Sequence, residues 1–161
     1  MDVWQNLALG FQVALSPYNL FFCFLGCLLG TLIGVLPGIG PLAAISILIP
    51  LTFDMSPVTA IITLSGLYYG AMYGGSTTSI LVNMPGESSS VVTCLDGYQM
   101  ARKGRAGAAL GMSAFASFVA GTISILFLTF SAIPLVNAAL SFGPPEYFAL
   151  TFMGLTLVAS L

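Results

Sequence analysis

The sequence predicts an all-α, polytopic integral membrane protein. Of its 161 residues, 58% are hydrophobic and only 5% are charged, and the mean hydropathy is +1.05. Soluble domains carry about 25% charged residues, so this deficit excludes the soluble class. Uncharged stretches cover residues 3–53, 55–86 and 106–145, and a spanning helix needs roughly 20 apolar residues. We therefore expect about four or five transmembrane or half-spanning helices, some interrupted or re-entrant, in a single membrane domain over residues 1–161.

Charge and residue types exclude several functions. The net charge of −2 gives no reason to expect a nucleic-acid partner. The sequence contains no His, its three Cys lack metal-type spacing, and no nucleophile–base set or phosphate-binding glycine loop is recognisable. We expect neither an enzyme nor a protein with a resident cofactor or metal.

The first segment, residues 1–16, predicts a helix that lies in the membrane interface. Trp4, Leu7, Phe11 and Leu15 recur at roughly helical spacing, and polar residues lie largely between them. Ser16-Pro17 then opens the first long helix, because proline is tolerated in a first turn.

The first long helix is expected from about residue 18 to residue 36. Gly26, Gly30 and Gly34 recur every four residues and so share one face of it. Small residues at this spacing let helix backbones approach closely in lipid. A packing face is therefore the preferred interpretation of these three glycines.

The helix should break at the sequence Leu-Pro-Gly-Ile-Gly-Pro, which spans residues 36–41. One interpretation is an unwound segment in which Gly38, Gly40 and Pro41 line a solute site, because freed backbone groups must be paired inside the protein or line a cavity. The alternative is a tight turn at the membrane surface. Residues 42–53 are short for a span and suit a half-helix.

A second helix is expected over residues 57–73, with glycines again at four-residue steps. It runs into the most polar part of an apolar region, residues 74–87, which reads Gly-Gly-Ser-Thr-Thr-Ser-Ile-Leu-Val-Asn-Met-Pro-Gly-Glu. Polar groups at membrane depth must face protein or water, so we expect an interrupted helix at a solute site here. Whether it forms a re-entrant hairpin or a kinked span stays open. Its candidate binding residues are Ser76, Thr77, Thr78, Ser79, Asn83, Pro85 and Gly86.

The remaining segments supply orientation and boundaries. Glu87 and Asp96 are interpreted as capping and turn residues. All three basic residues fall within residues 101–107, which assigns this loop to the cytoplasm by the positive-inside tendency. A long span follows over residues 106–133, with Pro134 ending or kinking it, and the last segment stops while still apolar. We expect the chain to be part of a larger, repeat-containing transporter.

Two interruptions in apolar helices favour a secondary transporter, because paired broken segments are the best sequence signal for its site. Helix N-termini can hold a carboxylate, and hydroxyl, amide and carbonyl oxygens can coordinate a small cation. The alternative is a membrane scaffold or assembly subunit whose glycine faces only pack helices. A channel lacks support, because no ring of charge is present.

Long motifs in this chain resemble the large membrane subunit of tripartite tricarboxylate transporters, the TctA family. They are Gly-Val-Leu-Pro-Gly-Ile-Gly-Pro at 34–41, Tyr-Gly-Ala-Met-Tyr-Gly-Gly-Ser-Thr-Thr-Ser-Ile-Leu at 69–81, Asn-Met-Pro-Gly-Glu at 83–87, Asp-Gly-Tyr at 96–98 and Gly-Arg-Ala-Gly at 104–107. The resemblance implies an N-terminal portion of a multi-pass permease in the bacterial inner membrane. It further implies import of small carboxylates, Na⁺ or H⁺ as coupling ion, and two partners: a small membrane subunit and a periplasmic solute-binding protein.

Overall fold

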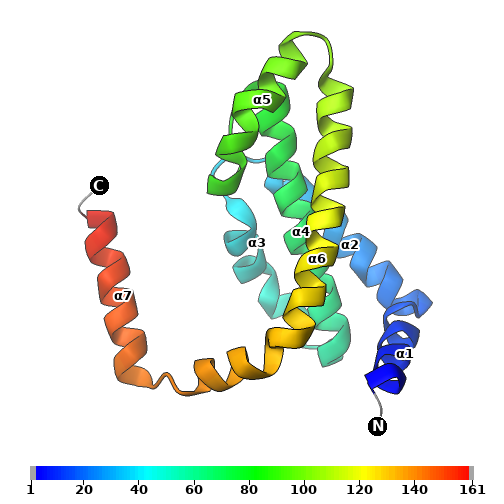
Figure 1. Ribbon diagram of the computed structural model, residues 1–161, viewed down its shortest axis with the longest axis vertical. Helices are drawn as coiled ribbons and strands as arrows, with labels where there is room; N and C mark the ends of the chain where they lie inside the picture. The colour runs from blue at the N-terminus through cyan, green and yellow to red at the C-terminus, as the bar shows by residue number, and fades with distance from the viewer. Residues whose placement is uncertain (1–2, 160–161) are drawn as a thin grey trace. The chain divides into compact units, whose positions relative to one another are not determined.

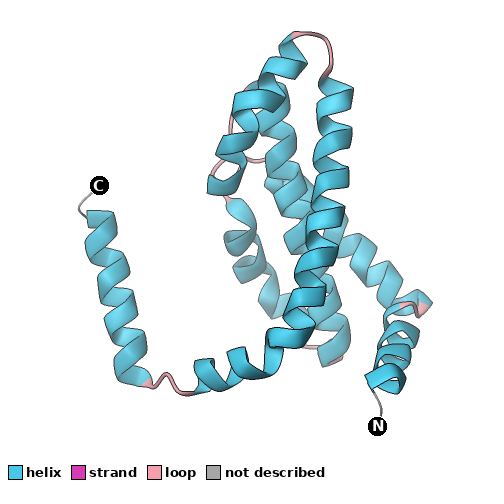
Figure 2. Ribbon diagram, viewed as in Figure 1, coloured by secondary structure: helices cyan, strands magenta, loops and turns pink. Residues whose placement is uncertain are grey.

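The computed structural model describes residues 3–159, and these residues form helices joined by short turns, without a strand. Figure 1 shows their order and Figure 2 their helical content, which confirms the all-α prediction for this part of the chain. The elements are α1 (Val3–Ala14), α2 (Pro17–Gly34), α3 (Gly40–Leu48), the 3-10 helix η1 (Ile49–Thr52), α4 (Pro57–Val82), the 3-10 helix η2 (Ser88–Ser90), α5 (Val91–Arg102), α6 (Ala106–Leu140) and α7 (Pro144–Ala159). They divide into two compact units, Met1–Ser117 and Phe118–Leu161.

The first unit is built on α2 and α4, which pack backbone against backbone. A Cβ added to Gly26 would collide with the carbonyl oxygen of Thr63, and one added to Gly34 with that of Ala71. Because the contacting positions rise together along both helices, α2 and α4 run parallel. Their glycines face one another at four-residue steps, so the predicted packing face is confirmed. These glycines are Gly26, Gly30 and Gly34 on α2 and Gly66, Gly70 and Gly74 on α4.

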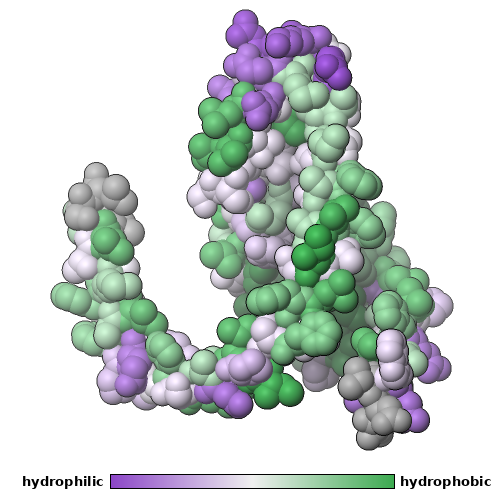
Figure 3. Space-filling model, viewed as in Figure 1, coloured by the Kyte–Doolittle hydropathy of each residue, from purple (hydrophilic) through white to green (hydrophobic). Residues whose placement is uncertain are grey.

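Small residues form the interior of this unit, and large apolar residues cover its outside. Ala44, Ala71 and Ser79 have no exposed surface, and Leu67 and Ile80 are the largest of the fully buried apolar side chains. Phe24 on α2 is 64% exposed and Leu42 on α3 is 75% exposed. Figure 3 shows hydrophobic residues spread over much of the visible surface. Small residues inside and apolar residues outside are what helix packing in lipid requires, because lipid tails solvate large apolar side chains.

The starting ends of α2 and α4 share a small polar cluster. Ser16 and Ser56 each cap a helix: the side-chain oxygen accepts a hydrogen bond from the backbone N–H three residues later, that of Asn19 and of Thr59 respectively. The buried Asn19 amide donates to the carbonyl oxygen of Val13 at 2.8 Å, and its oxygen accepts from the Thr59 hydroxyl at 2.8 Å. The Asn19–Thr59 bond ties the two helix starts together and fixes the register from which the glycine contacts follow.

Between α2 and α4 the chain returns through a short helix, as the sequence predicts for residues 42–53. α3 has 9 residues, and η1 adds 4 more with Pro50 in its first turn. Together they fall short of a full span. α3 packs on α4, and the Ser46 hydroxyl bonds back to the carbonyl of Leu42 at 2.9 Å.

The second helix is longer than expected, and the expected interruption at residue 74 is wrong. α4 continues unbroken through Gly74, Gly75 and the hydroxyl run as far as Val82. Two physical reasons account for this. The glycines are held by packing, since Gly74 lies against the carbonyl of Thr31 on α2. The hydroxyls are paired within the helix itself, because a Ser or Thr side chain can bond to the carbonyl one turn back.

After α4 the chain folds back along the helix, and α5 then packs beside the C-terminal end of α4. Gly97 of α5 lies against the side chain of Ile80, where a Cβ would come within 2.7 Å of Cγ1. α5 ends at the exposed basic residues Arg102, Lys103 and Arg105. In Figure 3 hydrophilic residues gather at the end of the unit where α5 meets α6.

The second unit holds the later part of α6 and α7. Pro134 lies inside α6 and does not end it, and the ribbon changes direction in this part of the chain (Figure 1). α7 begins at Pro144, and the Glu146 carboxylate accepts from the N–H of Gly143 at 2.8 Å. Among residues 3–159, α2 and α6 are the helices long and apolar enough to cross a membrane, whereas α4 has the length with a lower hydropathy.

Candidate solute site at the two helix breaks

The first break, between α2 and α3, requires glycine at two positions. α2 ends at Gly34, and α3 begins at Gly40. Gly38 has φ 89° and Gly40 has φ 65°, conformations that L side chains rarely adopt. The predicted break at residues 36–41 is therefore confirmed, and it reverses the chain so that α3 starts beside the end of α2.

The second break follows α4 and begins at Asn83. Asn83 has φ 60° and ψ 31°, which is the left-handed conformation, and its N–H bonds to the carbonyl of Thr78. Asn is one of the few non-glycine residues that tolerate this conformation, and it commonly ends helices in this way. The turn sends residues 84–87 back along α4. As a result Gly86 lies directly on Gly75, where a Cβ at either position would meet the other segment.

The two breaks meet at one point. The N–H of Gly38 donates to the carbonyl oxygen of Gly86 at 3.3 Å. Gly86 also approaches the end of α2, because a Cβ on it would lie 2.8 Å from the carbonyl oxygen of Gly34. Segments nearly fifty residues apart in the sequence are thus joined at the level of Gly75 on α4.

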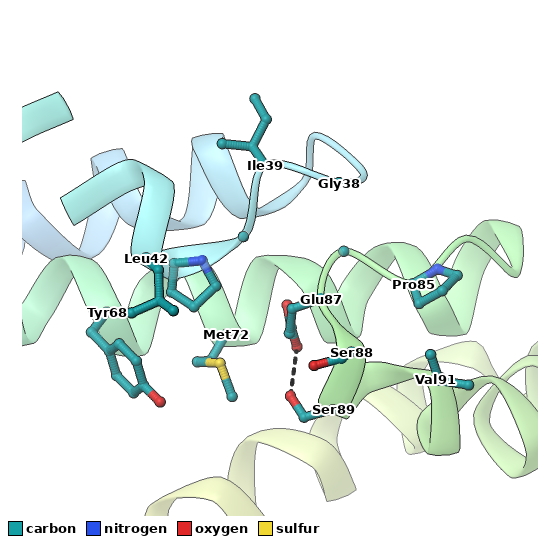
Figure 4. Close-up of a pocket in the computed structure, with 13 residues that line it drawn as sticks. Gly38, Ile39, Leu42, Tyr68, Met72, Pro85, Glu87, Ser88, Ser89 and Val91 are labelled. Atoms are coloured by element: carbon teal, nitrogen blue, oxygen red, sulfur yellow. Dashed lines mark hydrogen bonds between the residues drawn. The ribbon is translucent and has the colours of Figure 1, made fainter. Parts of the chain in front are cut away.

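A cavity of about 690 Å³ opens beside this junction. Five of the predicted binding residues line it: Gly38, Gly40, Pro41, Pro85 and Gly86. α4 contributes Tyr68 and Met72, and the segment that starts α5 contributes Ser88 and Ser89 (Figure 4). The wall is therefore mostly backbone and apolar side chain, with a few hydroxyl groups and one carboxyl group.

The hydroxyl run of α4 lies away from this cavity. Thr77 bonds to the carbonyl of Tyr73 at 2.9 Å, and Thr78 and Ser79 both bond to the carbonyl of Gly75, at 3.0 and 2.9 Å. Ser76 lines a separate cavity of about 410 Å³ between α4, α5 and the start of α6, together with Asp96. A role of these four residues in solute binding stays a prediction.

Asn83 also lies outside the lining of the cavity. Its backbone conformation gives it a structural role as the cap of α4, and its side chain is exposed. Solute binding by Asn83 likewise stays a prediction.

Glu87 lines this cavity but, like Met72, Ser88 and Ser89, was not among the predicted binding residues, and it is the one of these four that can carry a charge. Its Oε1 accepts from the Ser89 hydroxyl at 3.4 Å, the bond drawn in Figure 4. Its Oε2 is buried without a hydrogen-bond partner among the described residues and presses on Gly75 so closely that a Cβ there would collide with it. The sequence did hold one sign of a role for Glu87 in the site: it is the one acidic residue between Asp54 and Asp96, in an otherwise uncharged region.

Glu87 lies in the connection between α4 and α5, outside the helices. The side chain of Glu87 is partly buried, and Ser89 and Ser90 are its hydrogen-bonding neighbours. Ser90 also holds the backbone here, since its hydroxyl donates to the carbonyl of Glu87 at 2.9 Å and accepts from the Glu87 N–H at 3.3 Å.

The cavity offers anion-binding chemistry through helix ends. α3 begins among its lining residues, at Gly40 and Pro41, and the cap residue Ile39 gives no side-chain hydrogen bond to the first turn. η2 and α5 begin there as well, at Ser88 and Val91. The first N–H groups of a helix lack partners within the helix and carry the positive end of its dipole. No basic side chain lines the cavity among the described residues, so any positive potential comes from backbone.

The family model described as the tripartite tricarboxylate transporter TctA family matches residues 20–161. The chain belongs to this family. The resemblance carried by the motifs at 34–41 and 69–87 is thereby confirmed, and so is the assignment to a class of membrane proteins.

One curated relative of this TctA-family chain comes from Agrobacterium vitis and is described as an uncharacterized 52.8 kDa protein in the TAR-I ttuC' 3' region. The two are 62% identical over 161 residues, and the match covers 100% of this chain and 32% of the relative. The chain thus spans about a third of the length of the curated relative that it matches. No solved structure matches it.

Proposed function

We propose that this chain forms part of the large permease subunit of a cation-coupled carrier that imports small di- or tricarboxylates across the bacterial inner membrane. The observation that supports this most directly is that the starts of α3 and of the η2–α5 segment open on one cavity. Broken helices whose N-termini point at the anionic group of a substrate are the usual construction of a secondary transporter's site.

The depth of the cavity supports the same proposal. At 1.5 Å per residue, α4 rises about 28 Å from Pro57 to Gly75, and α5 rises about 18 Å from the cavity to the basic residues that follow it. These lengths, laid end to end, match the roughly 40–45 Å of a bilayer with its headgroups. A subunit placed with its basic loop at the cytoplasmic surface would hold the cavity near the bilayer midplane, where carrier sites lie.

The partners in this proposal are a small membrane subunit and a periplasmic solute-binding protein, in keeping with a family of tripartite transporters. The basic loop at residues 101–107 faces the cytoplasm, and the lipid bilayer covers the apolar outer surface. The carrier itself performs no covalent chemistry.

Transport by vesicles tests the proposal. The full-length subunit and its small membrane partner are reconstituted, and uptake of labelled citrate, tricarballylate, succinate and malonate is measured with and without the purified binding protein. We expect uptake of at least one of these carboxylates that depends on the binding protein. A scaffold subunit, the alternative function, would give none.

A cavity-filling variant ties uptake to this site. Met72→Trp places a large ring in the cavity, and we expect it to remove uptake while membrane abundance is kept. Phe24→Trp, on an exposed position of α2, is the matched control and should transport as the wild type does. Equal uptake by both variants would show that the solute passes elsewhere.

A further inference from the structure

The cavity contains one carboxyl group, and the proposed transport function leaves it unexplained. Glu87 lies at the end of the second break, on the wall that receives the substrate anion in the proposed function. A capping role accounts for its position before η2. It does not account for the buried Oε2, which has no hydrogen-bond partner among the described residues.

The position of the Glu87 Oε2 atom depends on one neighbouring residue. Oε2 rests on Gly75, and a side chain of any size at that position would displace it. The position of Gly75 is itself fixed. Its carbonyl accepts hydrogen bonds from the hydroxyls of Thr78 and Ser79, and Gly86 packs against its Cα. The carboxyl is therefore held in one place beside the cavity, with one oxygen bonded to Ser89 and the other shielded from solvent.

An ionised Glu87 and a substrate carboxylate would oppose each other in this cavity. Two negative charges that share a partly buried site repel, and the repulsion favours protonation of one of them. Both groups would also compete for the same helix N-termini, those of α3 and of the η2–α5 segment. Whatever neutralises Glu87 therefore strengthens binding of the anion.

We propose that Glu87 takes up a proton as the cavity binds a carboxylate, so that this one side chain couples proton movement to substrate movement. This inference rests on the proposed function and names H⁺ as its coupling ion. In the step, a carboxylate oxygen of Glu87 uses a lone pair to form an O–H bond with a proton from a hydronium ion, whose own O–H bond breaks and leaves water. The group becomes neutral, and release of the substrate reverses the step.

The surroundings of Glu87 fit this assignment. Tyr68 on α4 is the one other titratable side chain among the lining residues, and the first break, η2 and the start of α5 contribute none. α2 presents the carbonyl of Gly34 to the neighbouring residue, Gly86; as the negative end of a helix dipole, this carbonyl would not compensate a carboxylate. A bound anion would favour the protonated form of Glu87, because two negative charges in one partly buried cavity repel each other. By linkage, protonation must then raise the affinity for the anion by the same factor.

Proton uptake on binding is the direct test. Each carboxylate of the panel is titrated calorimetrically into the full-length wild-type subunit, in buffers that differ in ionisation enthalpy, from acid to alkaline pH. We expect about one proton taken up per carboxylate bound above the pKa of Glu87, and affinity that falls by up to about tenfold per pH unit there. Glu87→Gln removes both effects. Asp54→Asn, at an exposed carboxyl in the turn before α4, keeps both.

The outcomes separate this inference from the function on which it rests. If no carboxylate binds to the wild type, the proposed function and this inference both fail. Binding with no proton uptake, or with the same uptake in Glu87→Gln, overturns the inference alone. So does an affinity that depends on Na⁺ at constant pH and loses this dependence in Glu87→Gln, because Glu87 would then hold a metal cation. A wild-type subunit that binds a carboxylate without taking up a proton overturns the inference whatever the variant does.

Discussion

A single methyl group at Gly30 should separate the two central helices. A Cβ on Gly30 would collide with the carbonyl oxygen of Leu67 and lie 2.8 Å from its carbonyl carbon and 2.9 Å from the Ala71 nitrogen. All three atoms are backbone, so no side chain can rotate away. Ordinary contacts of a Cβ begin at 3.4 Å, and α2 and α4 must therefore move apart along the face that Gly26 and Gly34 share.

The magnitude follows from overpacking. Inserting extra atoms into a well-packed interior lowers the free energy of unfolding by about 1–3 kcal/mol. We expect Gly30→Ala to lie at the upper end, about 3 kcal/mol, because the contacts at neighbouring glycines are lost as well. Gly30→Leu should lower membrane abundance or assembly rather than substrate affinity alone.

Thermal unfolding of the detergent-purified full-length subunit measures this effect. The control is Gly10→Ala on α1, where an added Cβ has nothing within 4 Å and should slightly favour the helix. If Gly30→Ala unfolds at the same temperature as Gly10→Ala, the direct backbone contact of α2 with α4 is refuted.

Three further predictions concern other residues. Asn83→Ala puts alanine, which tolerates the left-handed conformation less well than asparagine, at the end of α4 and should lower the free energy of unfolding by about 1 kcal/mol. Asn83→Gly should fold normally. If Asn83 also binds solute, both variants lose uptake in vesicles. A cysteine replacing Lys103 should react with an impermeant thiol reagent only from the cytoplasmic side, and periplasmic labelling would reverse the topology. Asn19→Ala leaves the Thr59 hydroxyl without this partner and should lower the free energy of unfolding by about 1–3 kcal/mol; a double-mutant cycle with Thr59→Val should show coupling, and additive effects would contradict the bond.

Spacing made the helix packing predictable, because a four-residue repeat of glycine places every member on one face. The sequence could not reveal which helix faced which, since both α2 and α4 carry the repeat. The break at residues 36–41 was predictable for a similar reason. Two prolines and two glycines leave a helix few conformations in which to continue.

The break near residue 74 was mispredicted because glycine has two opposite meanings. Gly74 and Gly75 lower helix propensity, yet they also permit the close contacts with Thr31 and Gly86, and α4 continues unbroken through both. Composition alone does not distinguish these cases. The true end was recognisable in principle, because Asn83 followed two residues later by Pro85 is the sequence of a helix cap. Glu87 was assigned to capping because its contact with Gly75 depends on a fold-back that the sequence does not encode locally.

Because the chain folds back after Asn83, the length of α4 determines where Gly86 meets the helix and therefore where the cavity forms. From Gly75 to Val82 the helix climbs about 10 Å, and the extended residues that follow descend by a similar distance to bring Gly86 onto Gly75. One residue inserted into the helix between Gly75 and Val82 would rotate Asn83 by about 100° and direct residues 84–87 away from α2. An insertion or deletion between Gly75 and Gly86 should therefore disrupt the junction of the two breaks, whereas an apolar exchange at an exposed position such as Phe24 leaves that junction unchanged.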